Sequence, residues 1–228
     1  MSQNTSTDKL HTAATIDKLA HTNLLRPDPK LDFIIANSKK NNLPDITVSP
    51  LQGAYLGIQA RLIGAKSVLE IGTLGGYSTL HFVRAGANVT SIDISERHQQ
   101  VARANLAEAG AADAAVEFVL GAALDVLPRL AREGRVFDLV FVDADWDEQY
   151  AYFDWAVKLA RPGGCVYVDN VIRALLADGE DAVQGRKESL LTQVGRDQRV
   201  SATLVPTVSS HKLVSVDMFD GFLLAVKL

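Results

Sequence analysis

The sequence predicts an α/β fold in which helices cover both faces of a mainly parallel β-sheet. Three observations lead to this prediction. Short apolar runs that suit buried strands alternate with segments whose apolar residues recur at helical spacing. A glycine-rich turn joins the first such strand to the helix after it. The most apolar runs end on acidic residues, as strands of a parallel sheet do where ligands bind.

The elements follow in order from these patterns. Residues 1–9 are polar and are expected to be frayed. Pro44 marks a loop, and Pro50 suits the first turn of a helix. The predicted helices cover residues 12–25, 29–41, 50–63, 76–84, 96–109, 124–133, 149–160 and 187–197. The predicted strands cover residues 67–71, 89–93, 116–120, 137–142, 165–168, 202–208 and 222–226, with a turn at 161–164.

Composition fits one enzyme domain spanning residues 1–228. Of these residues 47% are hydrophobic, which is ample for a core, and no repeat or linker divides the chain. The net charge of −4 gives no electrostatic case for binding nucleic acid or a membrane. Without a long apolar span or an apolar signal core, we expect a cytoplasmic protein. The single cysteine, Cys165, excludes an internal disulfide and is expected to be a buried thiol.

The glycine turn predicts a site for a nucleoside cofactor. The first strand ends on Glu70-Ile71-Gly72 and is followed by Gly75-Gly76. Glycines allow a tight turn and a close approach of a ligand to the backbone. The next strand ends on Asp93, and an acid about 20 residues beyond the first strand is placed to accept both hydroxyls of a ribose.

The same residues favour S-adenosylmethionine (SAM) over a dinucleotide. A dinucleotide site needs a third glycine so that helix amides can hold a pyrophosphate, and Glu70 would repel that group. SAM carries an ammonium, a sulfonium and a ribose but no phosphate. The spacing E-x-G-x-x-x-G with the distal Asp93 resembles the first two motifs of class I methyltransferases. A nicotinamide-dependent reductase is therefore disfavoured.

Further acids follow two other apolar strands. Asp143 and Asp145 come directly after the strand at 137–142, and Asp169 and Asn170 follow the strand at 165–168. Two carboxylates and one amide oxygen at neighbouring strand ends suit a hard divalent cation such as Mg²⁺. The acids could instead only cap the helices that follow. Spacing alone leaves both readings open.

Several motifs together resemble the cation-dependent catechol and caffeoyl-CoA O-methyltransferase family. They are Glu70–Thr79, Ser49-Pro50-x-Gln52-Gly53, Val142-Asp143-Ala144-Asp145, Val168-Asp169-Asn170-Val171, Asp197-Gln198-Arg199-Val200 and Asp220-Gly221-Phe222. The resemblance covers residues from about 20 to 228. It implies a class I methyltransferase sandwich with a Rossmann-like seven-stranded sheet and an antiparallel last strand. It also implies a homodimer, with helices in residues 1–60 contributing to the dimer and to the cofactor and acceptor sites.

The resemblance assigns roles residue by residue. Cofactor contacts are implied for Glu70, Gly72, Ser78, Asp93, Gly121, Ala122 and Asp143, with Asp93 on the ribose and Gly121-Ala122 beside the adenine. Apart from the resemblance, Tyr152 could also line the cofactor pocket. Metal ligands are implied at Asp143, Asp169 and Asn170. In that family the metal chelates two adjacent oxygens of a small-molecule acceptor. It acidifies one of them and aligns it with the methyl group.

One position departs from the family pattern. The family reads Asp-Ala-Asp-Lys, and its lysine is the general base, whereas this chain has Trp146. An indole has only an N–H donor and cannot take a proton. A phenol with a pKa of about 10 needs a base, but a carboxylic acid with a pKa of about 4 is already ionised at neutral pH. The departure slightly favours an acidic acceptor, with Trp146 as a flat wall.

Alternatives to this reading remain. A catechol-type diol could still react if the metal alone acidifies it, or if Asp145, His211 or Lys212 serves as base. The protein could also bind SAM as a dimer without transferring a methyl group. Arg173 could hold an acceptor carboxylate through its planar guanidinium, or simply pair with Asp181 or Glu180. We expect ordinary packing or surface roles for five further residues: Trp155, His11, His21, His81 and His98.

Overall fold

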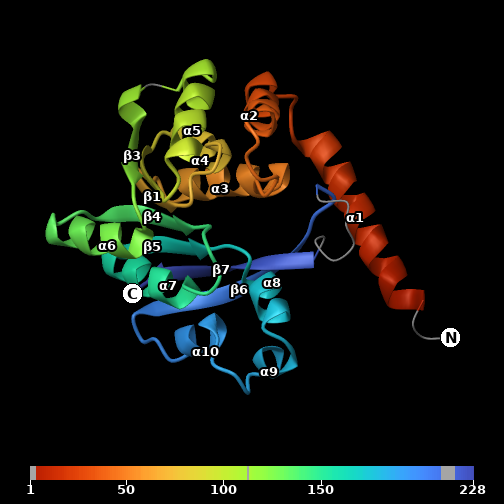
Figure 1. Ribbon diagram of the computed structural model, residues 1–228. Helices are drawn as coiled ribbons and strands as arrows, with labels where there is room; N and C mark the ends of the chain where they lie inside the picture. The colour runs from red at the N-terminus through yellow and green to blue at the C-terminus, as the bar shows by residue number, and fades with distance from the viewer. Residues whose placement is uncertain (1–3, 112, 212–218) are drawn as a thin grey trace.

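A seven-stranded sheet with helices on both faces organises the molecule (Figure 1). The computed structural model describes residues 4–111, 113–211 and 219–228. The strands are β1 (Ser67–Ile71), β2 (Asn88–Asp93), β3 (Val116–Leu120), β4 (Phe137–Val142), β5 (Ala160–Val168), β6 (Val200–Val208) and β7 (Phe219–Lys227). Their order across the sheet is β3-β2-β1-β4-β5-β7-β6. The prediction of an α/β fold is thus confirmed.

The strand directions confirm a mostly parallel sheet with an antiparallel last strand. The strands from β1 to β5 pair in parallel, and β7 runs antiparallel to both β5 and β6. Ile71 of β1 lies opposite Ile92 of β2 on one side and Val142 of β4 on the other. This register brings the residues that follow these strands to one edge of the sheet, where ligands bind in open α/β folds.

The helices occupy most of the predicted segments. They are α1 (Asn4–Leu24), α2 (Pro29–Lys40), α3 (Pro50–Leu62), α4 (Tyr77–Arg84), α5 (Glu96–Glu108), α6 (Ala123–Arg132), α7 (Gln149–Leu159), α8 (Val171–Ala177), α9 (Glu180–Val183) and α10 (Leu190–Val194), with a 3₁₀ turn at Asp113–Ala115. Side chains cap four of the described helices as their sequences favour. Asp28 accepts from the amides of α2, and Ser49, Ser95 and Ser189 do the same for α3, α5 and α10.

Several elements differ from the predictions. Helix α1 begins at Asn4, inside the segment that was expected to be frayed and well before the predicted start at residue 12. The predicted turn at 161–164 belongs to the irregular start of β5, where the pairing with β4 shifts register. Helix α10 is shorter than the predicted helix at 187–197. The short helices α8 and α9 lack the long apolar periodicity that would have predicted them.

Apolar side chains fill the space on both faces of the sheet. One cluster joins α6, α7 and α10 to the sheet, and the other joins α2, α3 and α4 to its opposite face. Cys165 is a buried free thiol in the second cluster, as predicted. In the part of the chain that the structure describes, no helix has the length and apolar character needed to cross a membrane.

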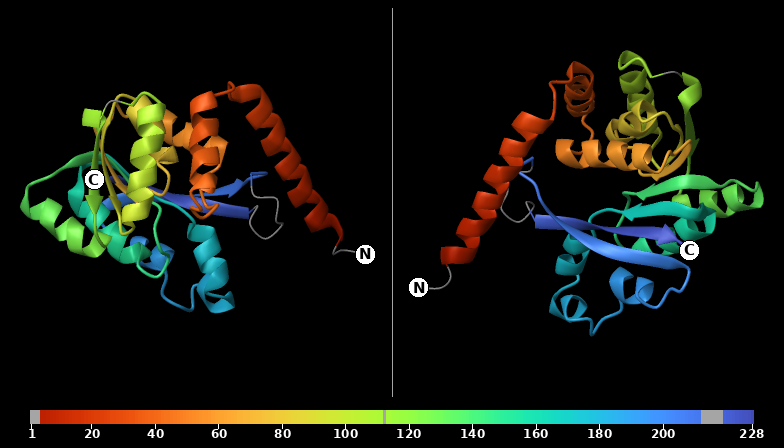
Figure 2. Two further views of the ribbon diagram at one scale, coloured as in Figure 1. Left: turned by 45° about the horizontal axis from the view of Figure 1, so that its top comes forward. Right: turned by 180° about the vertical axis from the view of Figure 1, so that it is seen from behind.

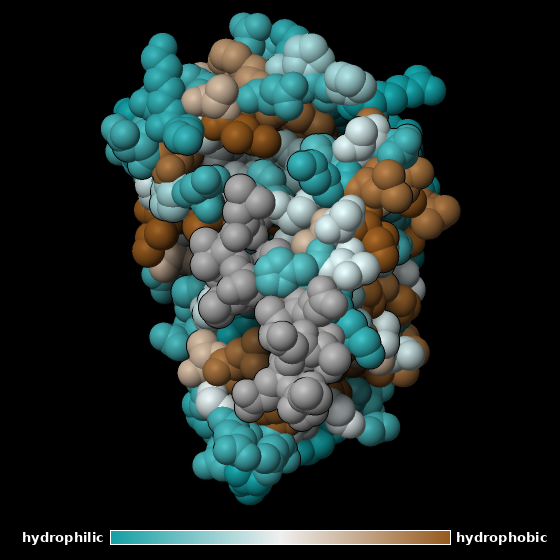
Figure 3. Space-filling view, turned by 90° about the vertical axis from the view of Figure 1, so that its right-hand side faces the viewer, coloured by the Kyte–Doolittle hydropathy of each residue, from teal (hydrophilic) through white to brown (hydrophobic). Residues whose placement is uncertain are grey.

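Helix α1 extends along one side of the body and is largely exposed (Figures 1 and 2). Asp17 ties it to the end of β6 by accepting hydrogen bonds from the amide and the hydroxyl of Ser210, at 2.7 and 2.6 Å. Its large apolar side chains Ile16, Leu19 and Leu24 are exposed. The face of the molecule on this side mixes hydrophilic and apolar surface (Figure 3).

Candidate active site

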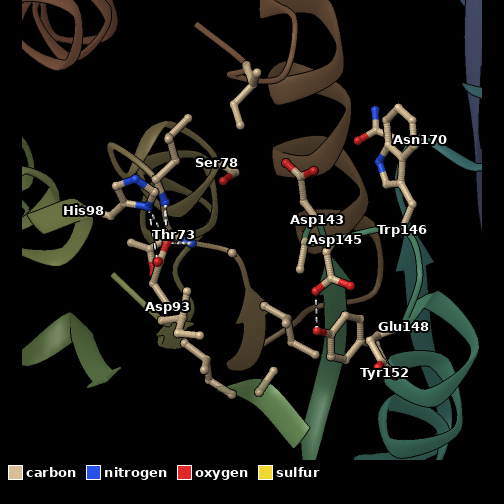
Figure 4. Close-up of a pocket in the computed structure, with 18 of the residues that line it drawn as sticks. Thr73, Ser78, Asp93, His98, Asp143, Asp145, Trp146, Glu148, Tyr152 and Asn170 are labelled. Atoms are coloured by element: carbon tan, nitrogen blue, oxygen red, sulfur yellow. Dashed lines mark hydrogen bonds and ion pairs between the residues drawn. The ribbon is translucent and has the colours of Figure 1, made fainter. Parts of the chain in front are cut away.

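A cavity of about 640 Å³ opens at the carboxyl ends of β1, β2 and β4 (Figure 4). Its walls come from the turns after these strands, from the loop before α3 and from the starts of several helices. The lining residues are Ile46, Thr47, Val48, Ile71, Gly72, Thr73, Leu74, Gly75, Tyr77, Ser78, Ile92, Asp93, Ile94, His98, Gly121, Ala122, Ala123, Leu124, Asp143, Ala144, Asp145, Trp146, Glu148, Tyr152, Asn170 and Arg173. Most of the predicted site residues are therefore brought together.

The turn after β1 needs glycine because two strand ends meet there. Gly72 has a φ of +100°, and a Cβ at this position would lie 1.9 Å from the carbonyl oxygen of Asp143. The amide of Asp143 in turn donates to the carbonyl of Ile71 at 2.8 Å. Leu74 also has a positive φ, of 46°, which is rare for a residue with a branched side chain and is typical of functional turns.

The carboxylate of Asp93 is held by this turn. Its Oδ2 accepts hydrogen bonds from the amides of Thr73 and Leu74, both at 3.0 Å, and its Oδ1 accepts from the amide of Ser95 at 2.8 Å. The Nδ1 of His98 lies 3.1 Å from Oδ1 and 3.2 Å from Oδ2. Asp93 is therefore an anchored anion on the cavity wall, with one imidazole facing both of its oxygens.

Glu70 lies behind the cavity wall. Its side chain has no exposed surface and accepts hydrogen bonds from the hydroxyls of Ser78, Thr79 and Ser91, each at 2.6 Å. Burial raises the pKa of Glu70 to about 7. Ser78 lines the cavity, whereas Glu70 is not among its lining residues. The predicted contact between Glu70 and a cofactor would thus pass through Ser78.

The turn after β3 closes the cavity beyond Asp93. Gly121 adopts a φ of +150°, and its amide donates to the carbonyl of Asp93 at 3.0 Å. Gly121 and Ala122 both line the cavity. A planar group placed here would meet backbone and small side chains, as expected for the adenine of a nucleoside.

The three residues predicted as metal ligands lie at or next to the other end of the cavity. Asp143 and Asn170 line it, and Asp169 is buried at 6% exposure with its Oδ1 accepting from the amide of Asn170 at 2.9 Å. The Nδ2 of Asn170 donates to Oδ2 of Asp220 at 2.8 Å, so the amide oxygen points back toward Asp143 (Figure 4). This donor set of two carboxylates and one amide oxygen fits a hard divalent cation.

The alternative that Asp143 and Asp169 only cap helices is wrong. The N-cap residues of α7 and α8 are Glu148 and Asn170, and neither helix has a side-chain cap bond. Asn170 itself is held at a φ of 58°, in the left-handed region. Such a conformation in a residue other than glycine persists when its surroundings enforce it, and it is common at ligand sites.

The candidate bases are not equivalent in the structure. Asp145 lines the cavity and accepts a hydrogen bond from the hydroxyl of Tyr152 at 2.6 Å, and burial together with this bond raises the pKa of Tyr152. His211 lines a second cavity, together with Asp17 and His21. Lys212 lies outside the described residues. Of the three, only Asp145 is shown to lie at the site.

Trp146 and Arg173 form one wall of the oxygen-rich end. The guanidinium carbon of Arg173 lies 5.3 Å from the centroid of the Trp146 ring, and Trp146 is 37% exposed. The amide of Arg173 donates to Oδ1 of Asp220 at 3.2 Å, and its guanidinium lies 4.0 Å from Oδ2 of that residue. The sequence left open a pairing of Arg173 with Asp181 or Glu180. The ion pair described for Arg173 is instead with Asp220, and Asp181 pairs with Arg186.

The remaining histidines and Trp155 have the roles that the sequence predicted, with one exception. His11 and His21 are exposed, and Trp155 packs against the core. Burial lowers the pKa of His81 to about 4, and no hydrogen-bond partner for its buried Nε2 lies among the described residues. His98 is the exception, since it reaches into the cavity. The sequence does contain a signal for this position. His98 follows the capping Ser95 by three residues, and this spacing directs its side chain back over the end of β2.

Known proteins resemble this chain over nearly its whole length. The O-methyltransferase family profile matches residues 27–215. The catechol O-methyltransferase of Mycobacterium tuberculosis is 42% identical over 216 residues, which cover 92% of this chain and 94% of that protein. The catechol O-methyltransferase of Niastella koreensis is 38% identical over 192 residues, covering 81% and 83%.

Solved structures agree in fold. The O-methyltransferase from Bacillus cereus, in complex with SAH, superposes with a TM-score of 0.84 at 37% identity, covering 96% of this chain and 100% of that chain. An O-methyltransferase from Streptomyces achromogenes involved in tomaymycin synthesis, in complex with SAM, gives a TM-score of 0.82 at 36% identity, covering 96% and 98%. Sequence, fold and the placement of the cavity lead to one conclusion: the chain belongs to the O-methyltransferase family.

Proposed function

We propose that this enzyme transfers the methyl group of SAM to an oxygen of a small acceptor that is already acidic, such as a carboxylic acid. The observation that carries the proposal is Trp146 in the position of the family's lysine base, beside the cation Arg173. Structural relatives in complex with SAH and SAM support the choice of cofactor.

The cavity has an element for each part of SAM. We propose that Asp93 accepts the ribose hydroxyls and that Gly121 and Ala122 flank the adenine. The amino acid end would lie over Gly72 and Ser78, with Asp143 near its ammonium and Tyr152 along the wall. Glu70 would act through Ser78, because its carboxylate is buried behind that hydroxyl.

The acceptor would occupy the end of the cavity near Trp146. Transfer is an in-line displacement in which the acceptor oxygen forms a bond to the methyl carbon while the sulfur–carbon bond breaks and sulfur keeps the electron pair. An ionised carboxylate can attack without losing a proton first. Arg173 supplies a planar cation for it, and Trp146 supplies an apolar face. Both would position the acceptor and exclude water.

A divalent cation would be held by Asp143, Asp169 and Asn170. When bound, such a cation supplies Lewis-acid stabilisation of an acceptor oxygen and a template for its orientation. The protein's own part is to turn the amide oxygen of Asn170 toward Asp143 through the bond to Asp220.

A catechol-type diol is a second candidate acceptor. It is favoured by the two relatives named catechol O-methyltransferase and by the retained oxygen ligands. In this case Asp145, in contact with Tyr152, is the described group that could accept the phenolic proton.

We also propose that residues 1–228 form one domain and that the enzyme is a homodimer. The exposed apolar side chains of α1 and α3, among them Ile16, Leu19, Ile58 and Leu62, support a partner contact.

Caffeic acid tests the proposal because it carries both a catechol and a carboxylate. The protein is incubated with caffeic acid, SAM and Mg²⁺, and the position of the new methyl group is found by mass spectrometry and NMR. A methyl ester would support an acidic acceptor, and Arg173→Ala should then raise KM more than it lowers kcat. A ring ether would establish the catechol reaction instead. No methylation of this acceptor or of a panel of acids and diols would support the alternative of a SAM-binding dimer without activity.

A further inference from the structure

His98 faces the carboxylate of Asp93 from the first turn of α5. The Ser95 hydroxyl accepts from the amide of His98 at 3.3 Å, which caps the helix and aims the imidazole back over the end of β2. Figure 4 shows the ring over the Asp93 carboxylate. The side chain is 26% exposed and lines the cavity. The helix is already capped by Ser95, so capping does not require the imidazole.

The hydrogen bonds of Asp93 leave one edge of the carboxylate to His98. A carboxylate offers about four in-plane acceptor positions. Three are taken by the amides of Thr73, Leu74 and Ser95. The fourth place lies between the two oxygens, and Nδ1 of His98 occupies it at 3.1 and 3.2 Å. A hydroxyl donor from a ligand can therefore reach this edge of the carboxylate only in place of the imidazole.

A ribose presents hydroxyl donors of this kind, which an acid at the end of the second strand accepts. We propose that His98 covers the ribose-binding edge of Asp93 in the cofactor-free enzyme and must swing away when the cofactor binds. This inference rests on the proposed function, in which Asp93 holds the ribose. It makes His98 a competitor of the cofactor and a specificity-determining residue, since only a ligand that brings a hydrogen-bond donor to this edge replaces what Asp93 loses.

Calorimetric titration with S-adenosylhomocysteine tests the proposal. His98→Ala should bind this ligand about threefold to tenfold more tightly than the wild type, because a net hydrogen bond no longer has to be broken. Arg97→Ala is the matched control. Arg97 precedes His98 on the same helix and contacts Asn41 instead of the cavity, and its loss should leave the affinity unchanged.

A second readout follows the imidazole itself. The protein has five histidines, so ¹⁵N-histidine labelling gives few signals, and the His98→Ala spectrum identifies the one from His98. Saturation with S-adenosylhomocysteine should shift that signal toward the position of a solvent-exposed imidazole. The same saturation should leave the signals of exposed His11 and His21 in place.

Two outcomes would overturn the inference. Weaker binding by His98→Ala would mean that the imidazole contacts the ligand, and an unmoved His98 signal at saturation would mean that it stays on Asp93. Failure of the proposed function looks different. In that case the wild type would not bind S-adenosylhomocysteine, or Asp93→Ala would bind it as well as the wild type.

Discussion

The side-chain amide of Asn170 donates to Oδ2 of Asp220 at 2.8 Å, and this bond decides which end of the amide faces the cavity. Asp220 lies on β7, far along the chain from Asn170. A carboxylate there can only accept, so the amide nitrogen must turn toward it and the amide oxygen toward Asp143. The antiparallel strand therefore takes part in the site without lining the cavity.

Replacing Asp220 should slow methyl transfer without weakening cofactor binding. We expect Asp220→Ala to lower kcat by about 10-fold to 100-fold, the usual effect of losing a group that orients a ligand. Asp220→Asn keeps an acceptor for the amide and should lose less. Affinity for S-adenosylhomocysteine, measured by calorimetry, should stay near the wild-type value in both variants. A loss of that affinity would mean that Asp220 supports the whole pocket.

Asp169→Ala tests the proposed cation. Asp169 is one of two carboxylates in the oxygen set, and its loss should abolish the part of the activity that depends on added Mg²⁺. Cofactor affinity should be nearly unchanged because Asp169 does not line the cavity. Rates are measured with Mg²⁺ and after chelation. A variant that keeps full activity with unchanged dependence on Mg²⁺ would exclude Asp169 as a ligand.

Gly72→Ala should destabilise the protein strongly. The new Cβ would have to lie 1.9 Å from the carbonyl oxygen of Asp143, so β1 and β4 must separate at the cavity. Gly86→Ala is the control, since Gly86 has a similar φ of +92° but no atom within 4 Å of an added Cβ. Gly86→Ala should lose only the free energy that corresponds to backbone strain, about 1–2 kcal/mol. Urea unfolding should show a clearly larger loss for Gly72→Ala, together with lost cofactor binding.

Glu70 should make the fold less stable as the pH rises. Its native pKa of about 7 lies above its ordinary value of 4.5. Between these two pH values Glu70 keeps its proton in the native state and has lost it in the unfolded state. The contribution of Glu70 to the free energy of unfolding is therefore fully present below pH 4.5 and is lost as the pH rises through 7. The full effect is about 3 kcal/mol. Glu70→Gln should lack it, and urea unfolding at pH 5 and pH 8 compares the two proteins.

His81 changes the stability with pH in the opposite direction, but it does so equally in the wild type and in Glu70→Gln, so its effect cancels in that comparison. Its pKa of about 4 lies below the ordinary 6.5, so its contribution is lost as the pH falls, and both proteins share it. The difference between wild type and Glu70→Gln thus reports Glu70. An equal pH dependence in both proteins would show that Glu70 is ionised throughout.

Trp146→Lys should shift the acceptor preference toward diols. Lysine at this position completes the Asp-Ala-Asp-Lys pattern and supplies a base at the oxygen-rich end of the cavity. We expect ring methylation of a catechol to rise at least several-fold relative to ester formation. Trp146→Leu, which removes the indole without adding a base, is the control. A catechol rate that is already high in the wild type and falls in Trp146→Lys would contradict the proposed role of Trp146.

The sheet was predictable because its signals are local and redundant. Strands β1, β3 and β4 begin and end at the predicted residues, since each is a short, mainly apolar run followed directly by a glycine or an acid. Helices α8 and α9 were missed because they are too short to show a period. The start of α1 was missed because its polar first turns look like a frayed end.

The sequence predicts the site residues that lie at the ends of strands. It does not predict contacts between side chains from distant parts of the chain. Register alone placed Gly72, Asp93 and Asp143 together. The sequence could not show that Asp220 would pair with Asn170, or that Ser78 would stand between Glu70 and the cavity. These contacts depend on side-chain directions that spacing does not determine.

The position of β7 also constrains how the chain can be made. β6 leaves the ribosome before β7, yet β7 is the strand that joins β6 to the rest of the sheet. Until β7 has emerged and docked, β5 keeps an open hydrogen-bonding edge, and open edges invite pairing with other chains. Asp220 can meet Asn170 only after this docking, so a single late step both covers the edge of β5 and sets the direction of the Asn170 side-chain amide.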